Sequence, residues 1–381
     1  MRILCLQPSS IFETFGGIEY YLDDILQMAG EIQGHENIWT VIPQRTSHFN
    51  DLERPYGKTL VPFSRNPLTK RFENRFSPLL LKRCLETAKA FHPAFLLCGH
   101  AALGPIAFAV RKILKIPYFT VAYGIESWGN LWPQDEYCLN RADGIISISQ
   151  WTERLLRGRG HSNIEVVHPA LDPAFEEPYR ATASADKTLR LLSVSRLDAG
   201  EQYKGQDHVL QALASLSQKD RNFNFHYTIQ GDGTDLPRLQ AMADRLGLSK
   251  KTTFLTKVTN RAELKEIYRK HNVYVMPSRF GRWNGKWRGE GFGIVYVEAA
   301  ATGLPSIAYN CGGATDIIQD GVTGRLLRPD DITGLATCLQ ELHKNPENIQ
   351  QMGKSAYDRT MNHFTRSAVR RELESAFRSL C

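Results

Sequence analysis

Two glutamates, Glu290 and Glu298, frame a glycine-rich bend in the stretch 290–298, which reads Glu-Gly-Phe-Gly-Ile-Val-Tyr-Val-Glu. Its two glycines remove side chains where a ligand would approach the backbone. The helical pattern that begins at Ile294 would point free N–H groups toward an anion such as a diphosphate. The two carboxylates would accept hydrogen bonds from the hydroxyls of a sugar and a ribose. A plain glycine turn before a surface helix is the competing interpretation.

Two cations follow the apolar run 189–195. Arg196 comes directly after this run, and Lys204 follows it after a short polar loop. Cations at the carboxyl end of a strand can neutralise a diphosphate without a metal ion. The alternative is a solvated basic loop. Further glycine turns after apolar runs offer either backbone N–H groups for a ligand or ordinary turns: Gly16 and Gly17, Gly231 and Gly233, and Gly312 and Gly313.

The segment 279–288 is rich in arginine and tryptophan and contains no acidic residue. Tryptophan faces stack on sugar rings, and arginines pair with phosphates. We expect Arg282, Trp283 and Trp287 to cover the bound sugar diphosphate or to contact a second, phosphorylated substrate, an acceptor. The alternative is a surface loop whose tryptophans pack on neighbouring side chains.

A second basic segment, 65–89, contains seven Lys or Arg residues and two glutamates, interleaved with apolar side chains. A basic amphipathic stretch of this kind can lie on an anionic membrane surface. A charged, solvated helix face is the alternative.

The elements that would position these residues alternate in type. Short apolar runs lie at 2–7, 38–42, 94–98, 117–122, 144–148 and 164–167, and again at 189–195, 225–229, 252–255, 273–276 and 305–308. Amphipathic helical stretches separate them, which is typical of βαβ units and parallel sheets. The series breaks at 172–188, a polar and proline-containing stretch that indicates an interdomain linker. Ligands of such α/β folds bind beyond the carboxyl ends of the strands.

Length and composition agree with a two-domain globular protein. The chain has 381 residues, more than one core of roughly 250–300 residues usually supports. Its formal net charge of +7 favours an anionic partner, but no zinc-finger, leucine-zipper or RNA-binding signature favours nucleic acid. No stretch reaches the roughly 20 apolar residues that span a bilayer, and residues 1–8 fit a buried strand better than a secretory signal. Seven scattered cysteines without a C-x-x-C pair indicate a reducing, cytoplasmic location.

Taken together, these motifs resemble glycosyltransferase family 4, a group of retaining enzymes. The spacing of Glu290 and Glu298 matches the E-x7-E hallmark of the family, Arg196 and Lys204 match its diphosphate-binding pair, and 16–19 matches its amino-terminal glycine loop. The resemblance implies an α/β protein of the GT-B fold, in which two doubly wound Rossmann-like domains face each other across a cleft. The implied domains are 1–172 plus 364–381, which binds the acceptor, and 188–363, which binds the donor.

The resemblance also implies roles for individual residues. Glu290 should bind donor-sugar hydroxyls, Glu298 the ribose, and Arg196 and Lys204 the diphosphate. The segment 254–259 resembles the one whose backbone faces the nucleobase. The remaining residues expected to bind the donor are Gly16, Gly17, Gly231, Val258, Gly291, Phe292, Gly293, Ile294 and Val295.

Two departures from the family pattern affect the expected site. Tyr123 stands where the family usually has a histidine that touches the donor sugar, so a phenol would have to donate that hydrogen bond. We expect Tyr123 to line the sugar pocket and nearby Glu126 to contact the acceptor. Asp316 follows the glycine pair 312–313, where the family usually has a glutamate.

The predicted function is retaining transfer of a hexosyl group, from UDP-glucose or another UDP-hexose to a glycan or lipid-linked acceptor, without metal or cofactor. The departing diphosphate carries growing negative charge, which cations and a helix start can stabilise. We expect no nucleic-acid partner, and peripheral contact with the inner face of an anionic membrane remains an option. The alternatives are a sugar-nucleotide epimerase or an inverting transferase on the same fold, and a non-catalytic sugar-nucleotide-binding protein.

Overall fold

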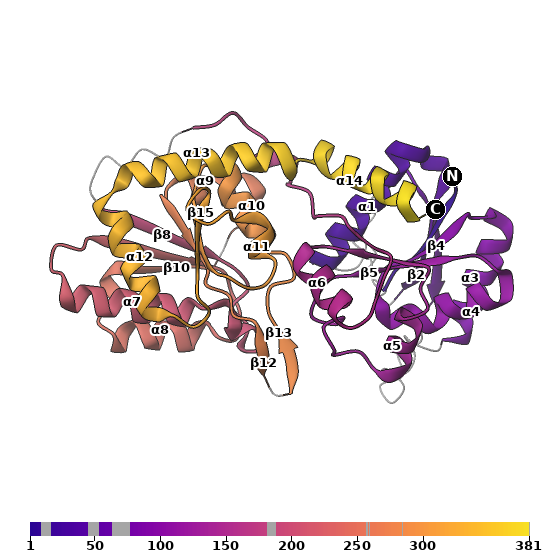
Figure 1. The fold of residues 1–381 in the computed structure, drawn as a ribbon, viewed down its shortest axis with the longest axis horizontal. Coiled ribbons are helices and arrows are strands. Elements are labelled where there is room, and N and C mark those ends of the chain that lie inside the picture. Colours follow the sequence, from indigo (N-terminus) through magenta and orange to yellow (C-terminus); the bar gives the residue numbers. More distant parts are fainter. Residues whose placement is uncertain are drawn as a thin grey trace. The chain divides into compact units, whose positions relative to one another are not determined.

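The computed structural model describes residues 1–8, 17–44, 53–62, 77–180, 188–256, 258, 260–283 and 285–380. The chain divides into two compact units, Met1–Ala170 with Val369–Cys381, and Leu171–Ala368. Each unit is built on a parallel sheet with helices on its faces (Figure 1).

Unit 1 contains a seven-stranded sheet with the order β3-β2-β1-β4-β5-β6-β7. Its strands are β1 (Ile3–Leu6), β2 (Ile38–Gln44), β3 (Gly57–Pro62), β4 (Phe95–Cys98), β5 (Tyr118–Ala122), β6 (Gly144–Ser147) and β7 (Ile164–Val166). Its helices are α1 (Gly17–Gln33), α3 (Pro78–Phe91), α4 (Gly104–Leu114), α5 (Pro133–Leu139), α6 (Gln150–Gly158) and the larger part of α14 (Arg366–Leu380).

Unit 2 contains a six-stranded sheet with the order β10-β9-β8-β11-β14-β15. Its strands are β8 (Leu189–Val194), β9 (Phe225–Gln230), β10 (Thr252–Leu255), β11 (Val273–Val275), β14 (Ser306–Tyr309) and β15 (Gly324–Leu327). Its helices are α7 (Gln206–Lys219), α8 (Leu236–Arg245), α9 (Arg261–Arg269), α10 (Ile294–Ala301), α11 (Ala314–Ile317), α12 (Ile332–Lys344) and α13 (Pro346–His363). A separate antiparallel hairpin, β12 (Gly281–Trp283) and β13 (Lys286–Arg288), lies between β11 and α10 in the chain.

Both sheets are doubly wound, because the strand order reverses within each of them. The reversal falls between β1 and β4 in unit 1 and between β8 and β11 in unit 2. Ligands of open α/β sheets bind beyond the carboxyl ends of the strands at such a reversal. In unit 2, therefore, the segments that follow β8 and β11 are where a ligand is expected.

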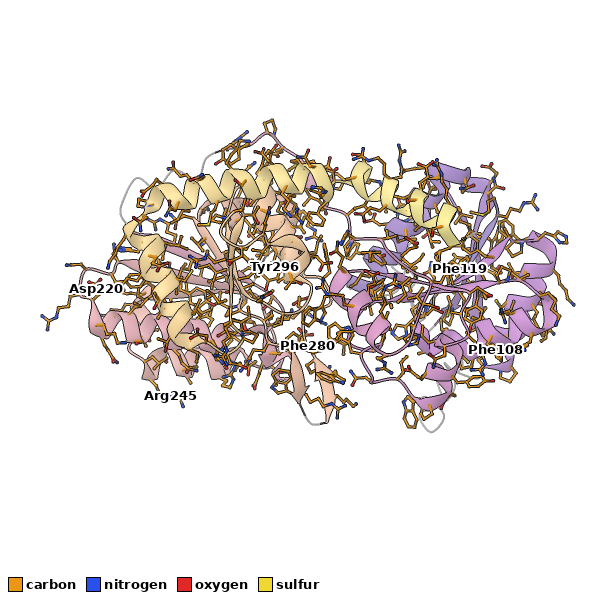
Figure 2. All side chains as sticks on the ribbon, in the orientation of Figure 1. Phe108, Phe119, Asp220, Arg245, Phe280 and Tyr296 are labelled. Carbon is orange, nitrogen blue, oxygen red and sulfur yellow. The ribbon has the colours of Figure 1, made fainter. Side chains whose placement is uncertain are left out.

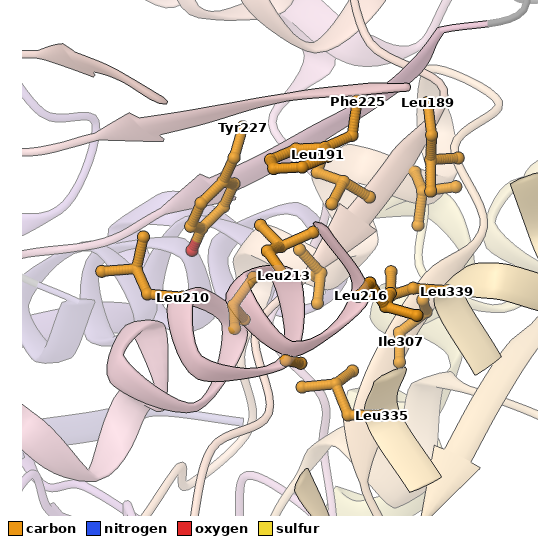
Figure 3. Close-up of a cluster of buried hydrophobic side chains, with 14 of the residues drawn as sticks. Leu189, Leu191, Leu210, Leu213, Leu216, Phe225, Tyr227, Ile307, Leu335 and Leu339 are labelled. Carbon is orange, nitrogen blue, oxygen red and sulfur yellow. The ribbon is translucent and has the colours of Figure 1, made fainter. Parts of the chain in front are cut away.

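The core of unit 2 holds these segments in place. Leu210, Leu213 and Leu216 lie on one face of α7 at helical spacing and pack beneath β8 and β9, where Leu191 and Tyr227 are fully buried (Figure 3). Burial of one such leucine contributes about 1.5–3 kcal/mol. The loop between β8 and α7 is thus fixed at both ends by buried side chains.

His271 makes the stability of unit 2 depend on pH. Its ring is buried between Thr228 Oγ1 at 2.8 Å and the backbone oxygen of Ile267 at 2.6 Å, and burial lowers its pKa to about 4. The unfolded chain, with a histidine pKa of about 6.5, binds this proton more readily. Stability should therefore be complete above about pH 6.5 and decline by roughly 2–4 kcal/mol as the pH falls toward 4.

Urea unfolding between pH 4 and 7 tests this expectation. His271→Gln should flatten the pH dependence, whereas His363→Gln, at an exposed position, should leave it unchanged. An equal slope in His271→Gln and in the wild type would show that His271 is not responsible.

Candidate functional site

Four charged side chains meet beyond the carboxyl ends of β8 and β11. Arg196 follows β8, and Glu201 and Lys204 belong to a 3₁₀ helix, Ala199–Lys204, which we call the 199–204 loop. Arg196 Nη2 donates to Glu201 Oε1. Lys204 Nζ lies 3.6 Å from Glu201 Oε2 and 3.6 Å from Glu290 Oε2. The structure therefore brings together Arg196, Lys204 and Glu290, which the sequence predicted to share a site.

Buried polar atoms that lack a hydrogen-bond partner lie at the same place. Oε2 of Glu201, Nε of Arg279 and Oε2 of Glu290 make no hydrogen bond within the described part of the chain. Most buried polar atoms in proteins are hydrogen-bonded, because leaving one unpaired costs about 1–3 kcal/mol. Such atoms are suited to a polar ligand that supplies the missing partners.

The start of α10 lies directly after Glu290 in the chain. Gly293 precedes the helix with a φ of +92°, a left-handed conformation that favours glycine, and a Cβ there would lie 2.6 Å from the ring of Tyr296. The first N–H groups of a helix, here those of Ile294 and Val295, have no intrahelical acceptor. Phe292 is buried against Phe364, with ring centroids 5.8 Å apart. The predicted anion-binding backbone is thus held rigidly beside Glu290, and Figure 2 locates Tyr296 in this region.

Glu298, the second glutamate of the motif, is enclosed in the structure. Only 1% of the residue is exposed, and burial raises its pKa. Arg261 Nη1 donates to Oε1 at 2.7 Å, and the Tyr268 hydroxyl donates to Oε2 at 3.0 Å. Each oxygen therefore already has one donor from unit 2, and the expected ribose contact of Glu298 stays a prediction.

Gly231, which we expected to bind the donor, has a packing role. Its N–H donates to the backbone oxygen of Leu255 at 2.9 Å, so it does not point at a ligand. A Cβ at this position would collide with the backbone oxygen of Ser195. The glycine allows the loop after β9 to approach the end of β8, and the prediction that Gly231 binds the donor stays a prediction.

Gly231→Ala should therefore lower the free energy of unfolding by roughly 2–4 kcal/mol, since it adds both a clash and a strained φ of +149°. Gly247→Ala provides the matched control, because Gly247 has a φ of +70° with open space around it. We expect that control to lose about 1 kcal/mol. Equal losses in the two variants, measured by urea unfolding, would contradict the packing role.

The glycine pair 312–313 also serves packing. The N–H of Gly313 donates to the backbone oxygen of Glu290 at 2.9 Å, and a Cβ on Gly313 would collide with the backbone of Phe292. A Cβ on Gly312 would lie 2.8 Å from the same oxygen of Glu290. These glycines thus pack closely against the backbone of the Glu290 bend and stabilise it, a supporting role that the sequence did not reveal.

Tyr123 does not present a free hydroxyl. The side chain is buried, its hydroxyl donates to the backbone oxygen of Gly99 at 2.8 Å, and burial raises its pKa. Its N–H donates to Glu126 Oε1 at 2.6 Å, so Glu126 closes its own turn. The hydroxyl hydrogen that we expected the sugar to receive is thus used within unit 1 in this structure, and the contact of Tyr123 with the donor sugar stays a prediction.

The sequence analysis did not name His100 as a candidate site residue, although Gly99 and His100 directly follow the run 94–98. It lies at the carboxyl end of β4, and its ring stacks on Tyr123 with centroids 6.0 Å apart. Its Nδ1 accepts the N–H of Ala102 at 3.0 Å. A histidine after a strand beside the sheet reversal was the available signal.

The basic segment 279–288 forms the β12–β13 hairpin rather than an irregular loop. Arg282 pairs opposite Trp287, and Trp287 stacks on Phe280 with ring centroids 4.9 Å apart. Trp283 contacts Tyr203 of the 199–204 loop, with centroids 6.4 Å apart. Both indoles thus pack on neighbouring rings, as the alternative interpretation held, while the Arg282 side chain is exposed.

The remaining predicted residues include the amino-terminal glycines, Val258 and the basic segment 65–89. Gly16 lies outside the described residues, as do residues 63–76 of the basic segment 65–89. Gly17 begins α1 and is exposed, and Val258 is half-buried. In α3, Lys82 and Arg83 both lie near Glu86, at 3.8 and 3.0 Å. Among the described residues, no helix combines the length and the apolar character that crossing a bilayer requires.

Two family models match consecutive parts of the chain. The model described as Glycosyltransferase Family 4 matches residues 15–175, and the one described as Glycosyl transferases group 1 matches residues 175–359. The chain belongs to glycosyltransferase family 4. The second match contains Arg196, Lys204, Glu290 and Glu298.

Individual proteins support the family membership and the fold. A GDP-mannose-dependent alpha-(1-6)-phosphatidylinositol monomannoside mannosyltransferase of Mycolicibacterium smegmatis is 34% identical over 155 residues, which are 39% of this family 4 chain and 38% of that protein. The lipopolysaccharide outer core galactosyltransferase WaaB matches with a TM-score of 0.81 and 19% identity, over 100% of this chain and 99% of its own. HepE of Anabaena, solved with UDP-glucose, matches with a TM-score of 0.71 and 18% identity over 100% of both chains. The structural matches show the fold, which is the GT-B fold.

Proposed function

We propose that this family 4 chain transfers a hexosyl group from a nucleotide diphosphate sugar to a glycan or lipid-linked acceptor, with retention of configuration. One observation carries the proposal. Lys204 Nζ lies 3.6 Å from Oε2 of Glu290, an oxygen with no hydrogen-bond partner among the described residues, beside the start of α10. A cation and a helix start suit a diphosphate, and a carboxylate oxygen that can accept hydrogen bonds suits the hydroxyls of a sugar joined to it.

UDP-glucose is the donor we propose. HepE, which shares the fold, was solved with UDP-glucose, and WaaB is named as a galactosyltransferase. The M. smegmatis relative is named as GDP-mannose-dependent, so GDP-mannose is the competing donor. The nucleobase would lie near Val258, beyond the end of β10.

In the proposed reaction the bond between the anomeric carbon and the diphosphate oxygen breaks. The departing oxygen gains negative charge, which Lys204, Arg196 and the positive end of α10 stabilise. The acceptor hydroxyl attacks the same face of the sugar and passes its proton to the departing phosphate. Glu290 holds the sugar hydroxyls during this exchange.

We propose that no metal ion or cofactor takes part. In the parts of the chain that the structure describes, no group of three or more His, Cys, Asp or Glu side chains is arranged to hold a metal ion. Lys204 and Arg196 would supply the positive charge instead. Turnover that EDTA abolishes and Mg²⁺ restores would refute this part of the proposal.

In unit 2, the acceptor would meet the hairpin residues Arg282, Trp283 and Trp287. The exposed guanidinium of Arg282 suits a phosphate of a lipid-linked or phosphorylated acceptor. Replacing 282–287 with a short glycine linker should weaken transfer to such an acceptor. Unchanged affinity for both substrates would remove the hairpin from the acceptor site.

Thermal unfolding with UDP, GDP and ADP tests donor binding, because a ligand that binds only the folded chain raises its unfolding temperature. We expect the largest rise with UDP. Slow release of glucose from UDP-glucose would then separate an enzyme from a non-catalytic binding protein, and release of an epimerised sugar nucleotide would identify an epimerase. No stabilisation by any of the three nucleotides would overturn the proposal.

A further inference from the structure

Arg279 joins three parts of unit 2 that are far apart in the sequence. Its backbone N–H donates to the backbone oxygen of Tyr203 at 2.7 Å, and in the side chain Nη2 donates to the backbone oxygen of Gln202. Nη2 also lies 3.4 Å from Asp207 Oδ2, at the start of α7. The guanidinium carbon lies 5.9 Å from the ring centre of Trp283 in the hairpin. One side chain thus ties the 199–204 loop to α7 and to β12.

The guanidinium also requires a particular form of its neighbour His208. Arg279 Nη1 lies 3.1 Å from His208 Nε2, and arginine can only donate. His208 Nε2 must therefore be an unprotonated acceptor, which leaves the hydrogen on Nδ1, 2.8 Å from the Tyr309 hydroxyl. Burial lowers the pKa of His208, in agreement with a neutral ring.

A lysine could not make this set of contacts. The acceptors of Arg279 lie in different directions, on Gln202, Asp207 and His208, and the planar fork of a guanidinium reaches them at once. A lysine would bring a single ammonium on a flexible stem. The side chain of Arg279 is only 17% exposed, so contacts with its protein partners, rather than solvent, fix the position of the guanidinium.

Tyr203, which receives the N–H of Arg279, directly precedes Lys204. The backbone N–H of Arg279 binds Tyr203, and its guanidinium binds the backbone oxygen of Gln202. The guanidinium therefore restrains, through Gln202, the backbone from which the Lys204 side chain extends toward Glu290, and only this bond to the loop is lost in Arg279→Ala. We propose that Arg279 is a positioning residue for the donor site. It holds Lys204 opposite Glu290 and links the 199–204 loop to the hairpin. This inference rests on the proposed function, in which Lys204 binds the donor diphosphate.

A double-mutant cycle tests the inference, with UDP as the probe in isothermal titration. Lys204→Met should weaken UDP binding. Arg279→Ala should weaken it about tenfold in the wild-type background and less than threefold in the Lys204→Met background, because Arg279 acts through Lys204. Arg279→Lys should behave like Arg279→Ala, and added guanidinium ion at millimolar concentration should partly restore Arg279→Ala.

Arg325→Ala is the matched control, since Arg325 lies 3.5 Å from Asp320 and 3.4 Å from Glu341, residues away from the 199–204 loop. It should leave UDP binding unchanged. Equal losses from Arg279→Ala in both backgrounds would show that it acts by general destabilisation and overturn the inference, while the proposed function would stand. If Lys204→Met itself leaves UDP binding intact, the proposed role of Lys204 in donor binding fails, and the inference with it.

Discussion

Glu290→Gln should reduce the turnover of UDP-glucose about 100-fold without lowering the affinity for UDP. The carboxylate oxygen Oε2 lacks a hydrogen-bond partner in the described chain, and donor-sugar hydroxyls would supply one. Glutamine keeps the shape of the side chain but replaces one accepting oxygen by a donating amide. UDP carries no hexose, so its binding does not use this carboxylate.

The fold should survive this change, because Gly313 holds the backbone oxygen of Glu290 rather than its side chain. Glu341→Gln is the control, since Glu341 belongs to the same unit and is half exposed beside Arg325. Turnover of UDP-glucose and titration with UDP are measured on both variants. Wild-type turnover in Glu290→Gln would remove the carboxylate from the proposed mechanism.

The sequence predicted the sheets well because buried parallel strands have a clear pattern. Each of the apolar runs from 2–7 to 305–308 corresponds to a strand in the structure. The strands β3 and β15 were missed, since Gly57–Pro62 and Gly324–Leu327 have few apolar residues and lie at the edges of their sheets. The β12–β13 hairpin was missed because its basic and aromatic residues do not alternate like those of a half-buried strand.

The site was predicted in part, and the limit has a physical reason. Arg196, Lys204 and Glu290 were recognised by charge and by their place after strands. Gly231 and Tyr123 were assigned to ligands because the sequence does not show what packs against them. The roles of these two residues depend on Ser195 and Gly99, which the fold brings close from other strand ends.

Glu201 and Arg279 contact the site but were not predicted from the sequence, for the same physical reason. Glu201 belongs to the charged cluster and Arg279 binds the loop that carries it, yet neither lies at a spacing that marks it in the sequence. Glu201 pairs with Arg196 and approaches Lys204, and Arg279 binds the backbone of the loop that carries them. Residues that position a site act through contacts, and contacts between distant segments appear only in the fold.

The second large effect is expected at Lys204. Lys204→Met removes the ammonium group but keeps most of the apolar stem. Affinity for UDP should fall about 10- to 100-fold, because a charge-assisted bond to phosphate is worth about 1.5–3 kcal/mol. Affinity for uridine, which has no phosphate, should stay as it is. Isothermal titration with both compounds measures the difference.

The matched variant for Lys204→Met is Lys250→Met, which removes the same charge from an exposed position of the same unit. If net charge alone attracted the nucleotide, both variants would weaken UDP binding equally, and the loss would vanish at high salt. If Lys204 contacts the diphosphate, only Lys204→Met weakens binding, and the difference persists in salt because the Lys204 side chain is 12% exposed. Equal binding of UDP by Lys204→Met and the wild type would show that the diphosphate binds elsewhere. Lys204 would then have no role in donor binding, although it lies beside Glu290.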